Sequence, residues 1–370
     1  MINGEETNFQ EVYTYDGKVI CIEKLNEMFR ICFDFDEKKQ KKYTGIYEES
    51  IQYKDDIFIR FTRNGKTNVI KINILKSTSY YILSDKMYRI ELLNVINQEL
   101  LYLKDYVLEG LSLCLTNSKS YINVKGTQLS KNKFKIESFI GEKFCMNALT
   151  NKGIDKSDVL LISFHGGPES YEQLDSSRYG YVYESLLNFE YKRIKIVTFN
   201  YPGSISFGEL YRTKPYANWK NTLQDSFNEL MEFLNVSSEM PVFLIGGSFG
   251  ATASLMIKNE KYNIKKIAIN PLMNLRTYVN SIPKSYREWF EERFAHRDYN
   301  DITFHNLIKE NNYTEVLFVK GLNDEVIVNN WEYKDLKMSN HFIHVDNGKH
   351  NSNLYQRSNS IKSFIFDRIT

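Results

Sequence analysis

Cysteine is scarce in this chain. The four cysteines, Cys21, Cys32, Cys114 and Cys145, form no C-x-x-C pair and have no histidines close by in the sequence. Zinc sites and disulfide frameworks need regularly spaced cysteines, often together with histidines. The pattern argues against both and predicts four reduced thiols in hydrophobic cores. We expect no metal and no cofactor.

The chain also lacks an excess of charge of one sign. Its 48 basic and 46 acidic side chains leave a formal net charge of +2, so no global field draws it toward nucleic acid or an anionic membrane. It has no apolar run of the ~18 residues that a membrane helix needs, and its polar, acidic start, MINGEETNFQ, is unlike a secretory leader. We expect a soluble cytoplasmic protein with neither nucleic acid nor membrane as a partner. Its most basic run, residues 36–43, is expected to be a solvated hairpin turn.

Residues 1–130 are predicted to form a small β-rich accessory domain. Residues 57–72 alternate apolar and polar side chains on both sides of Asn64-Gly65, a pair that readily adopts the positive φ angles of a type I′ hairpin turn. Propeller blades repeat every ~40 to 45 residues, so about three would fit here. A closed propeller needs at least ~4 blades. The region is therefore either an incomplete propeller or an ordinary β-meander.

Residues 131–370 have a different rhythm, in which short apolar strands alternate with amphipathic segments such as 223–234. The strand candidates are 159–164, 194–199, 242–247, 265–270, 315–320 and 341–346. Near-continuous Val, Ile, Leu and Phe strands separated by helices indicate a mostly parallel sheet covered by helices on both faces. In such sheets the chemistry takes place at the carboxyl ends of the strands.

One of these strands ends in the pattern Gly246-x-Ser248-x-Gly250, followed by the helix-compatible ATASLMIKN. This pattern is typical of a nucleophile elbow, in which glycines permit a sharp turn that exposes the serine hydroxyl. Glycine-rich turns also bind phosphate. However, no lysine follows as in a P-loop, and the glycine spacing differs from that of a dinucleotide fingerprint. We therefore favour a nucleophilic Ser248.

A serine nucleophile needs a base, and the base needs an orienting acid. His350 lies in a Gly/Asn-rich loop after the last predicted strand, whereas His296, His305 and His344 fall in helical or strand segments and His341 begins the last strand. The acid is expected at the preceding strand end. Asp324 occupies that place in GLNDEVI, and we favour it over Asp346, which is only four residues before His350.

The oxyanion of an attacked carbonyl needs hydrogen-bond donors. The glycine-rich FHGGPES follows another predicted strand, and its Gly167 N–H and the N–H of Phe249 could face the substrate oxygen. We expect His165 to brace this loop by hydrogen bonds rather than to take part in catalysis.

Together these motifs resemble the catalytic domain of the prolyl oligopeptidase family of serine peptidases, within the α/β-hydrolase fold. The succession FHGGPES, NYPGSISFGELY, NWKNTLQDSFNELMEFL, GGSFGA, GLNDEVI and GKH carries the resemblance, which covers about residues 134–370. The resemblance implies that Ser248 is the nucleophile, Asp324 the acid and His350 the base. The chain departs from the family pattern at Pro202, where an arginine is usual, and at Val326, where a polar or basic residue near the substrate is common.

The resemblance also bears on the substrate. Related peptidases build a side-chain pocket from aromatic residues in the segment that here contains Tyr278, Trp289 and Phe290, although these rings could equally pack that segment onto the sheet. We expect a peptide or small acyl substrate. The chain is too short for the complete propeller that usually caps the family. The short cap could leave the site open to a bulkier substrate, or a second subunit could replace the missing blades.

Three functions are compatible with these residues. The first is a peptidase that works through an acyl-enzyme, with transpeptidation or macrocyclisation as a variant. The second is an esterase, thioesterase or other acyl transferase, because one triad serves any acyl transfer. The third is a binding protein on an inactive hydrolase scaffold, against which the intact set of Ser248, Asp324 and His350 argues.

Overall fold

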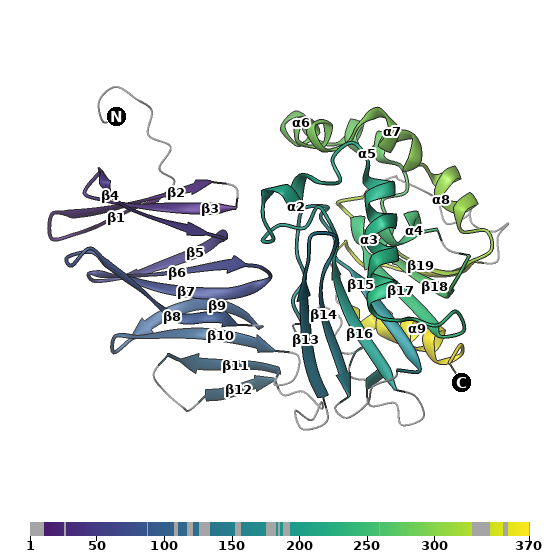
Figure 1. Cartoon of the computed structure of the whole chain (residues 1–370), viewed down its shortest axis with the longest axis horizontal. Coiled ribbons are helices and arrows are strands. Elements are labelled where there is room, and N and C mark those ends of the chain that lie inside the picture. The colour runs from purple at the N-terminus through teal and green to yellow at the C-terminus, as the bar shows by residue number, and fades with distance from the viewer. Residues whose placement is uncertain are drawn as a thin grey trace. The chain divides into compact units, whose positions relative to one another are not determined.

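The computed structural model of the chain describes most of its residues (Figure 1). The described residues are 11–25, 27–86, 88–106, 110–116, 121–125, 134–151, 157–174, 183, 186–187, 193–258, 260–327, 341–350 and 354–369. Residues 1–127, 173–177 and 205–209 form one compact unit, and the rest of the chain forms the second. The boundary expected between residues 130 and 131 lies outside the described residues.

The first unit contains three antiparallel sheets of four strands each, in which the strands follow one another in sequence order. The first sheet contains β1 (Glu11–Tyr15), β2 (Lys18–Leu25), β3 (Met28–Phe33) and β4 (Asp36–Thr44), the second β5 (Ile46–Tyr53), β6 (Asp56–Arg63), β7 (Lys66–Asn73) and β8 (Thr78–Lys86), and the third β9 (Arg89–Ile96), β10 (Glu99–Tyr106), β11 (Gly110–Leu115) and β12 (Tyr121–Lys125). The prediction of a β-rich region is confirmed. The three sheets formed by the described residues have the strand order of propeller blades, and a closed propeller needs at least ~4 blades.

The hairpin predicted at Asn64-Gly65 is confirmed. Asn64 has φ 53° and Gly65 has φ 67°, and Arg63 of β6 lies opposite Lys66 of β7. Two central residues with positive φ define the type I′ turn, whose twist matches that of the flanking strands. The turn also contacts Ser206, because the Gly65 N–H donates a hydrogen bond to the Ser206 hydroxyl oxygen (2.9 Å).

The prediction of a hairpin turn at residues 36–43 is wrong. These residues lie in strand β4, and the turn comes just before them, at Asp34 and Phe35, which both have positive φ. The lysines are accommodated because β4 is the outer strand of the first sheet. Lysine is common on edge strands, since its charge discourages pairing with other chains.

Two hydrophobic clusters hold the three sheets together. One joins the first and second sheets through residues such as Ile22, Phe29 and Ile70, and the other joins the second and third through residues such as Phe58 and Tyr102. All four cysteines are free and buried, as predicted. No helix among the described residues is long and apolar enough to cross a membrane.

The second unit is built on a sheet of eight strands in the order β13-β14-β16-β15-β17-β18-β19-β20. The strands are β13 (Phe134–Ile140), β14 (Cys145–Asn151), β15 (Val159–Phe164), β16 (Ile194–Asn200), β17 (Pro241–Gly247), β18 (Asn263–Ile269), β19 (Glu315–Gly321) and β20 (Phe342–Asp346). β13 pairs antiparallel with β14 and β14 with β16, whereas the pairs from β16 through β15 to β20 are parallel. The prediction of an α/β-hydrolase sheet is confirmed.

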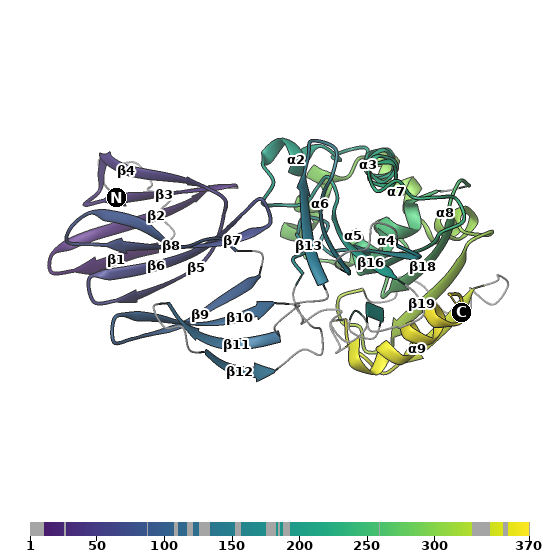
Figure 2. The ribbon, with the colours of Figure 1, turned by 60° about the horizontal axis from the view of Figure 1, so that its bottom comes forward.

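Helices cover both faces of this sheet. They are α2 (Glu209–Thr213), α3 (Trp219–Phe233), α4 (Phe249–Met256), α5 (Leu275–Ser281), α6 (Lys284–Arg293), α7 (His296–Asp301), α8 (Phe304–Glu310) and α9 (Leu354–Phe366). Figure 2 shows α3 and α9 on opposite sides of the sheet. Adjacent residues of a strand point to opposite faces of the sheet, so β17 can pack against both helices. Leu244 belongs to the hydrophobic cluster on the α3 side, whereas its neighbour Phe243 contacts Phe364 of α9.

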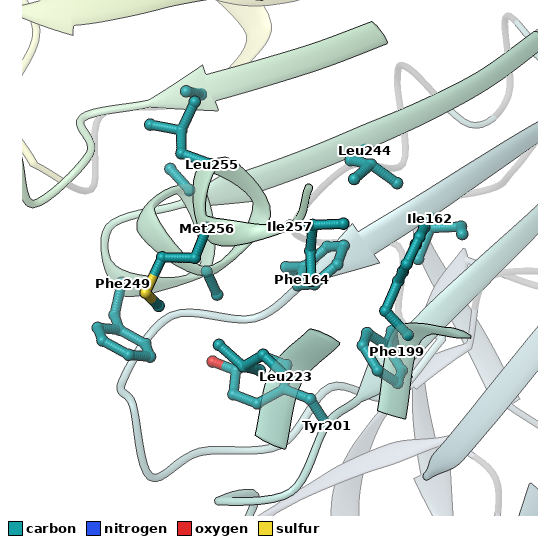
Figure 3. Close-up of a cluster of buried hydrophobic side chains, with 14 of the residues drawn as sticks. Ile162, Phe164, Phe199, Tyr201, Leu223, Leu244, Phe249, Leu255, Met256 and Ile257 are labelled. Atoms are coloured by element: carbon teal, nitrogen blue, oxygen red, sulfur yellow. The ribbon is translucent and has the colours of Figure 1, made fainter. Parts of the chain in front are cut away.

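The cluster on the α3 side anchors the helix that follows the elbow. Phe249, Leu255 and Met256 of α4 are each at most 1% exposed. Figure 3 shows them packed beside side chains of the sheet and of α3, namely Ile162, Phe164, Phe199, Leu223 and Leu244. All eight residues of α4 are buried, so the helix is held firmly against the sheet.

Candidate active site

Ser248 lies at the turn between β17 and α4, where the sequence predicted an elbow. Its backbone has φ 57° and ψ −129°, a region that side-chain-bearing residues rarely adopt. Its N–H donates to the carbonyl oxygen of Ile269 at the end of the neighbouring strand β18 (2.9 Å). The residue is partly exposed, whereas Phe249 beside it is buried. The turn thus presents a strained, accessible serine.

The two glycines of the pattern are required by close backbone contacts. A side-chain carbon at Gly250 would collide with the carbonyl oxygens of Phe164 and His165. A side-chain carbon at Gly246 would collide with the backbone of Gly250. The end of β15 therefore lies directly against the first turn of α4, and only glycine permits that approach.

Asp324 lies in the turn after β19 and binds the imidazole of His350. The His350 Nδ1 is 2.8 Å from Asp324 Oδ2 and 3.0 Å from Oδ1. Oδ1 also accepts hydrogen bonds from the N–H groups of Val326 and Ile327, each at 2.9 Å. Burial acts to raise the pKa of Asp324, but the hydrogen bond from His350 and those from the two N–H groups outweigh it and lower the pKa. The carboxylate is thus kept ionised beside the imidazole.

Asp346, the rival acid, is engaged elsewhere. Its two oxygens accept from Nε (2.7 Å) and Nη2 (2.9 Å) of Arg357 in α9, and it also accepts from the Gly348 N–H at 2.7 Å. The Arg357 side chain is 1% exposed. This buried bidentate pair fixes the start of the His350 loop to α9. Sequence reasoning missed Arg357, whose only signal was an arginine within the C-terminal helical segment.

The structure gathers the three predicted residues at one edge of the sheet. Ser248 follows β17, Asp324 follows β19 and His350 follows β20, and β17, β18, β19 and β20 are consecutive parallel neighbours. The carboxyl ends of parallel strands share one edge. A serine, a base and an acid in this arrangement can carry out nucleophilic attack on a carbonyl.

The loop with Gly167 follows β15, the neighbour of β17 on its other side. Gly167 has φ 135°, and a side-chain carbon there would lie 2.7 Å from the Glu169 nitrogen. Phe249 is the first residue of α4, where N–H groups have no partner within the helix. These two N–H groups remain our predicted oxyanion donors.

His165 is fully buried and held from several directions. Its Nδ1 is 2.7 Å from the Gly166 carbonyl oxygen and its Nε2 is 2.6 Å from Ser204 Oγ. Its ring stacks on Tyr201, with centroids 4.3 Å apart. These contacts suit a residue that braces the glycine-rich loop.

Glu169, in the same loop, forms a charged cluster that sequence reasoning missed. Its carboxylate pairs with Arg212 of α2 and Arg293 of α6, both at 2.9 Å, and with the Tyr216 hydroxyl. The Arg293 guanidinium lies over the ring of Trp289 at 4.2 Å. The cluster fastens the predicted oxyanion loop to α2 and α6. Arginines at these two positions were visible in the sequence, but their convergence on one carboxylate was not.

The aromatic residues predicted to line a pocket differ in burial. Phe290 is 6% exposed and is part of the hydrophobic core, whereas Tyr278 and Trp289 are partly buried and pack against that core. Burial, and then the negative charge of Asp324, raise the pKa of Tyr278. Val326, the other residue predicted to lie near the substrate, is two residues after Asp324 and is 40% exposed.

Within the described part of the chain, no group of three or more His, Cys, Asp or Glu side chains could hold a metal ion.

One family model matches part of the chain. The model of the prolyl oligopeptidase family matches residues 192–349, which confirms the resemblance carried by the motifs. No curated protein matches the sequence.

Solved structures of similar fold agree with this match. The chain is 13% identical to Pyrococcus horikoshii acylaminoacyl peptidase over 95% of its own length, with a TM-score of 0.70. It is 13% identical to puromycin hydrolase over 98% (TM-score 0.73) and 11% identical to oligopeptidase B from Trypanosoma brucei over 97% (TM-score 0.71). It spans 66%, 60% and 59% of these three chains respectively. At such identities the likeness shows a shared fold.

The strain at Ser248 leads to a stability prediction. Glycine adopts positive φ without penalty, whereas alanine keeps the side-chain carbon that causes the strain. We expect Ser248→Gly to have a free energy of unfolding about 1–3 kcal/mol higher than Ser248→Ala, measured by urea denaturation. Equal unfolding free energies for the two variants would show that the turn is not strained.

Proposed function

Residues 192–349 belong to the prolyl oligopeptidase family, and from this premise we propose that the chain is a serine peptidase that cleaves peptide bonds through an acyl-enzyme on Ser248. The observation that carries the proposal is the hydrogen bond between His350 and Asp324 at the sheet edge where the strained Ser248 is partly exposed. A structural ion pair would not need an accessible, strained serine on the same edge.

In the proposed first step the Ser248 hydroxyl attacks the substrate carbonyl carbon. The His350 Nε2 takes the hydroxyl proton, and Asp324, bound to Nδ1, stabilises the resulting imidazolium and fixes the tautomer. The oxygen of the tetrahedral intermediate accepts from the N–H groups of Gly167 and Phe249. The imidazolium then donates its proton to the leaving amine as the C–N bond breaks, which leaves an ester on Ser248.

Water completes the cycle in the second step. His350 takes a proton from the water as the water oxygen attacks the ester carbon. The imidazolium then returns the proton to the Ser248 oxygen as the C–O bond breaks, which releases the acid product and restores the serine hydroxyl. An amine in place of water would give transpeptidation or macrocyclisation. The same groups could act on an ester or thioester, which stays the alternative to a peptide substrate.

A substrate panel separates these functions. We expect the purified chain to cleave chromogenic peptide amides, and Ser248→Ala, which removes the nucleophile, to lose several orders of magnitude in kcat. Turnover of simple esters without any amide cleavage would favour the esterase alternative. Failure of a fluorophosphonate probe to label Ser248 in the folded protein would instead favour a binding protein.

The two carboxylates near His350 provide a test of the acid. We expect Asp324→Asn to keep the fold but lose up to ~10⁴-fold in kcat, because the amide favours the wrong imidazole tautomer. Asp346→Asn is the matched control. The substitution should weaken the ion pair with Arg357. We therefore expect it to lower the melting temperature while changing kcat little. An inactive Asp346→Asn beside a nearly normal Asp324→Asn would reverse the assignment.

We also propose that the chain self-associates through the outer face of its third sheet. Leu101 lies opposite Leu115, Leu103 opposite Leu113, and Leu113 opposite Ile122, so these five aliphatic side chains share one face. The other face of the sheet carries Leu100, Tyr102 and Cys114, which pack against the second sheet. Ile122 is 67% exposed.

The occupant we propose is the same face of a second copy. The outer face of the first sheet carries Glu23 opposite Arg30, with Arg30 also bound to Gln40. Such a charged face does not suit an aliphatic partner, so head-to-tail stacking is disfavoured. Two aliphatic faces are complementary to each other and close under two-fold symmetry.

Matched aspartate variants test this association. We expect a dimer at micromolar concentration by light scattering and a monomer for Leu113→Asp, because the introduced charge would be buried in the contact. Val12→Asp is the control, since Val12 is 54% exposed and lies in the first sheet. It should remain dimeric. A monomeric wild type, or dissociation of both variants, contradicts the proposal.

A further inference from the structure

Asn270 directly follows β18 and binds the two loops that carry the predicted acid and base. Its Oδ1 accepts from the Gly321 N–H at 2.8 Å, at the start of the Asp324 turn. Its Nδ2 donates to the carbonyl oxygen of His350 itself at 3.2 Å. The side chain therefore uses both ends of its amide, each on the main chain of a different catalytic loop.

The backbone around Asn270 reaches the remaining member of the set. The Asn270 N–H donates to the Val319 carbonyl oxygen (2.8 Å), and the carbonyl oxygen of Ile269, one residue earlier, accepts from the Ser248 N–H (2.9 Å). The position follows from the sheet order, because β18 lies between β17, which ends at the serine, and β19, which ends at the acid. The dipeptide 269–270 thus contacts all three loops.

The conformation of Asn270 is unusual and suits its residue type. It has φ 44° and is 4% exposed. Among residues with a side chain, asparagine enters the left-handed region most readily, and its amide can satisfy buried main-chain groups. Alanine at this position would leave the Gly321 N–H and the His350 carbonyl oxygen without these partners in a buried place, which is costly.

Other hydrogen bonds join the acid and base loops on their outer side. The Leu322 N–H donates to the Asp346 carbonyl oxygen (2.8 Å), and the Asn323 N–H donates to the Gly348 carbonyl oxygen (3.1 Å). These bonds link the two loops to each other but not to β18. The Asn270 side chain links both loops to the end of β18, where the Ile269 carbonyl oxygen accepts from the Ser248 N–H.

We propose that Asn270 is a positioning residue that sets the His350 main chain relative to both Asp324 and Ser248. This inference rests on the proposed triad, because positioning matters to turnover only if His350 serves as the base. In this role Asn270 does not touch the substrate and acts only through the two loops that it binds. Misplacement of a catalytic group by about 1 Å can cost ~10²-fold in rate.

Asn270→Gly is the informative variant, because glycine accepts the positive φ and so removes the amide without adding strain. We expect kcat for a peptide amide to fall by about 10²-fold with KM little changed, since the loss affects the reacting groups and not substrate binding. The pH profile of kcat/KM should shift as well, because the imidazole is held less firmly against Asp324.

Asn311→Ala is the matched control. Asn311 is also a fully buried asparagine whose Nδ2 binds two main-chain carbonyl oxygens, those of Leu255 (3.0 Å) and Leu307 (2.6 Å). It should lower the melting temperature while leaving kcat and the pH profile unchanged. Wild-type kcat in Asn270→Gly, or an equal loss of kcat in Asn311→Ala measured well below its melting temperature, would overturn the inference.

Proton NMR separates this inference from the proposed function. The His350 Nδ1 proton bound to Asp324 should give a low-field resonance, assigned by its absence in His350→Ala. If the wild type proves inactive, loss or broadening of this resonance in Asn270→Gly still supports the positioning role while the peptidase function fails. A resonance identical in wild type and Asn270→Gly contradicts the positioning role, whatever the activity.

Discussion

The candidate site depends on a single close approach of two backbone segments. Gly250, in the first turn of α4, lies so near the carbonyl oxygens of Phe164 and His165 that no side-chain carbon fits between them. This approach brings the end of β15, with its glycine-rich loop, beside the helix that starts after Ser248. The strain in the serine backbone is sustained because α4 is buried on every side and cannot relax outward.

The second constraint concerns two carboxylates, that of Asp324 in the turn after β19 and that of Asp346 at the end of β20. Each carboxylate is held by different donors. Arg357 occupies both oxygens of Asp346, whereas Asp324 is oriented by two backbone N–H groups and keeps its second oxygen for the imidazole. The environment of each carboxylate, and not its distance along the chain from the histidine, decides which one can serve the base.

The first unit is held together by apolar side chains packed between its sheets. The second sheet has a sheet on both sides and is apolar on both faces, through Ile59 and Ile70 on one and Phe58 and Val69 on the other. The first sheet ends the stack with a charged outer face, as capping repeats do. The third sheet presents leucines on its outer face instead, which is why we propose association through it.

Much of this could be predicted from the sequence, because it depends on local residue patterns. The Asn64-Gly65 turn, the parallel strands and the glycines around Ser248 are each specified by residues adjacent in the chain. The lysines of β4 misled the prediction, since an edge strand and an exposed turn have the same composition. The roles of Arg357, Glu169 and Asn270 depended on tertiary structure. Glu169 and Asn270 bind groups tens of residues away in the sequence, and Arg357 reaches Asp346 from a separate helix, so only the folded sheet and its helices bring these partners within hydrogen-bonding distance.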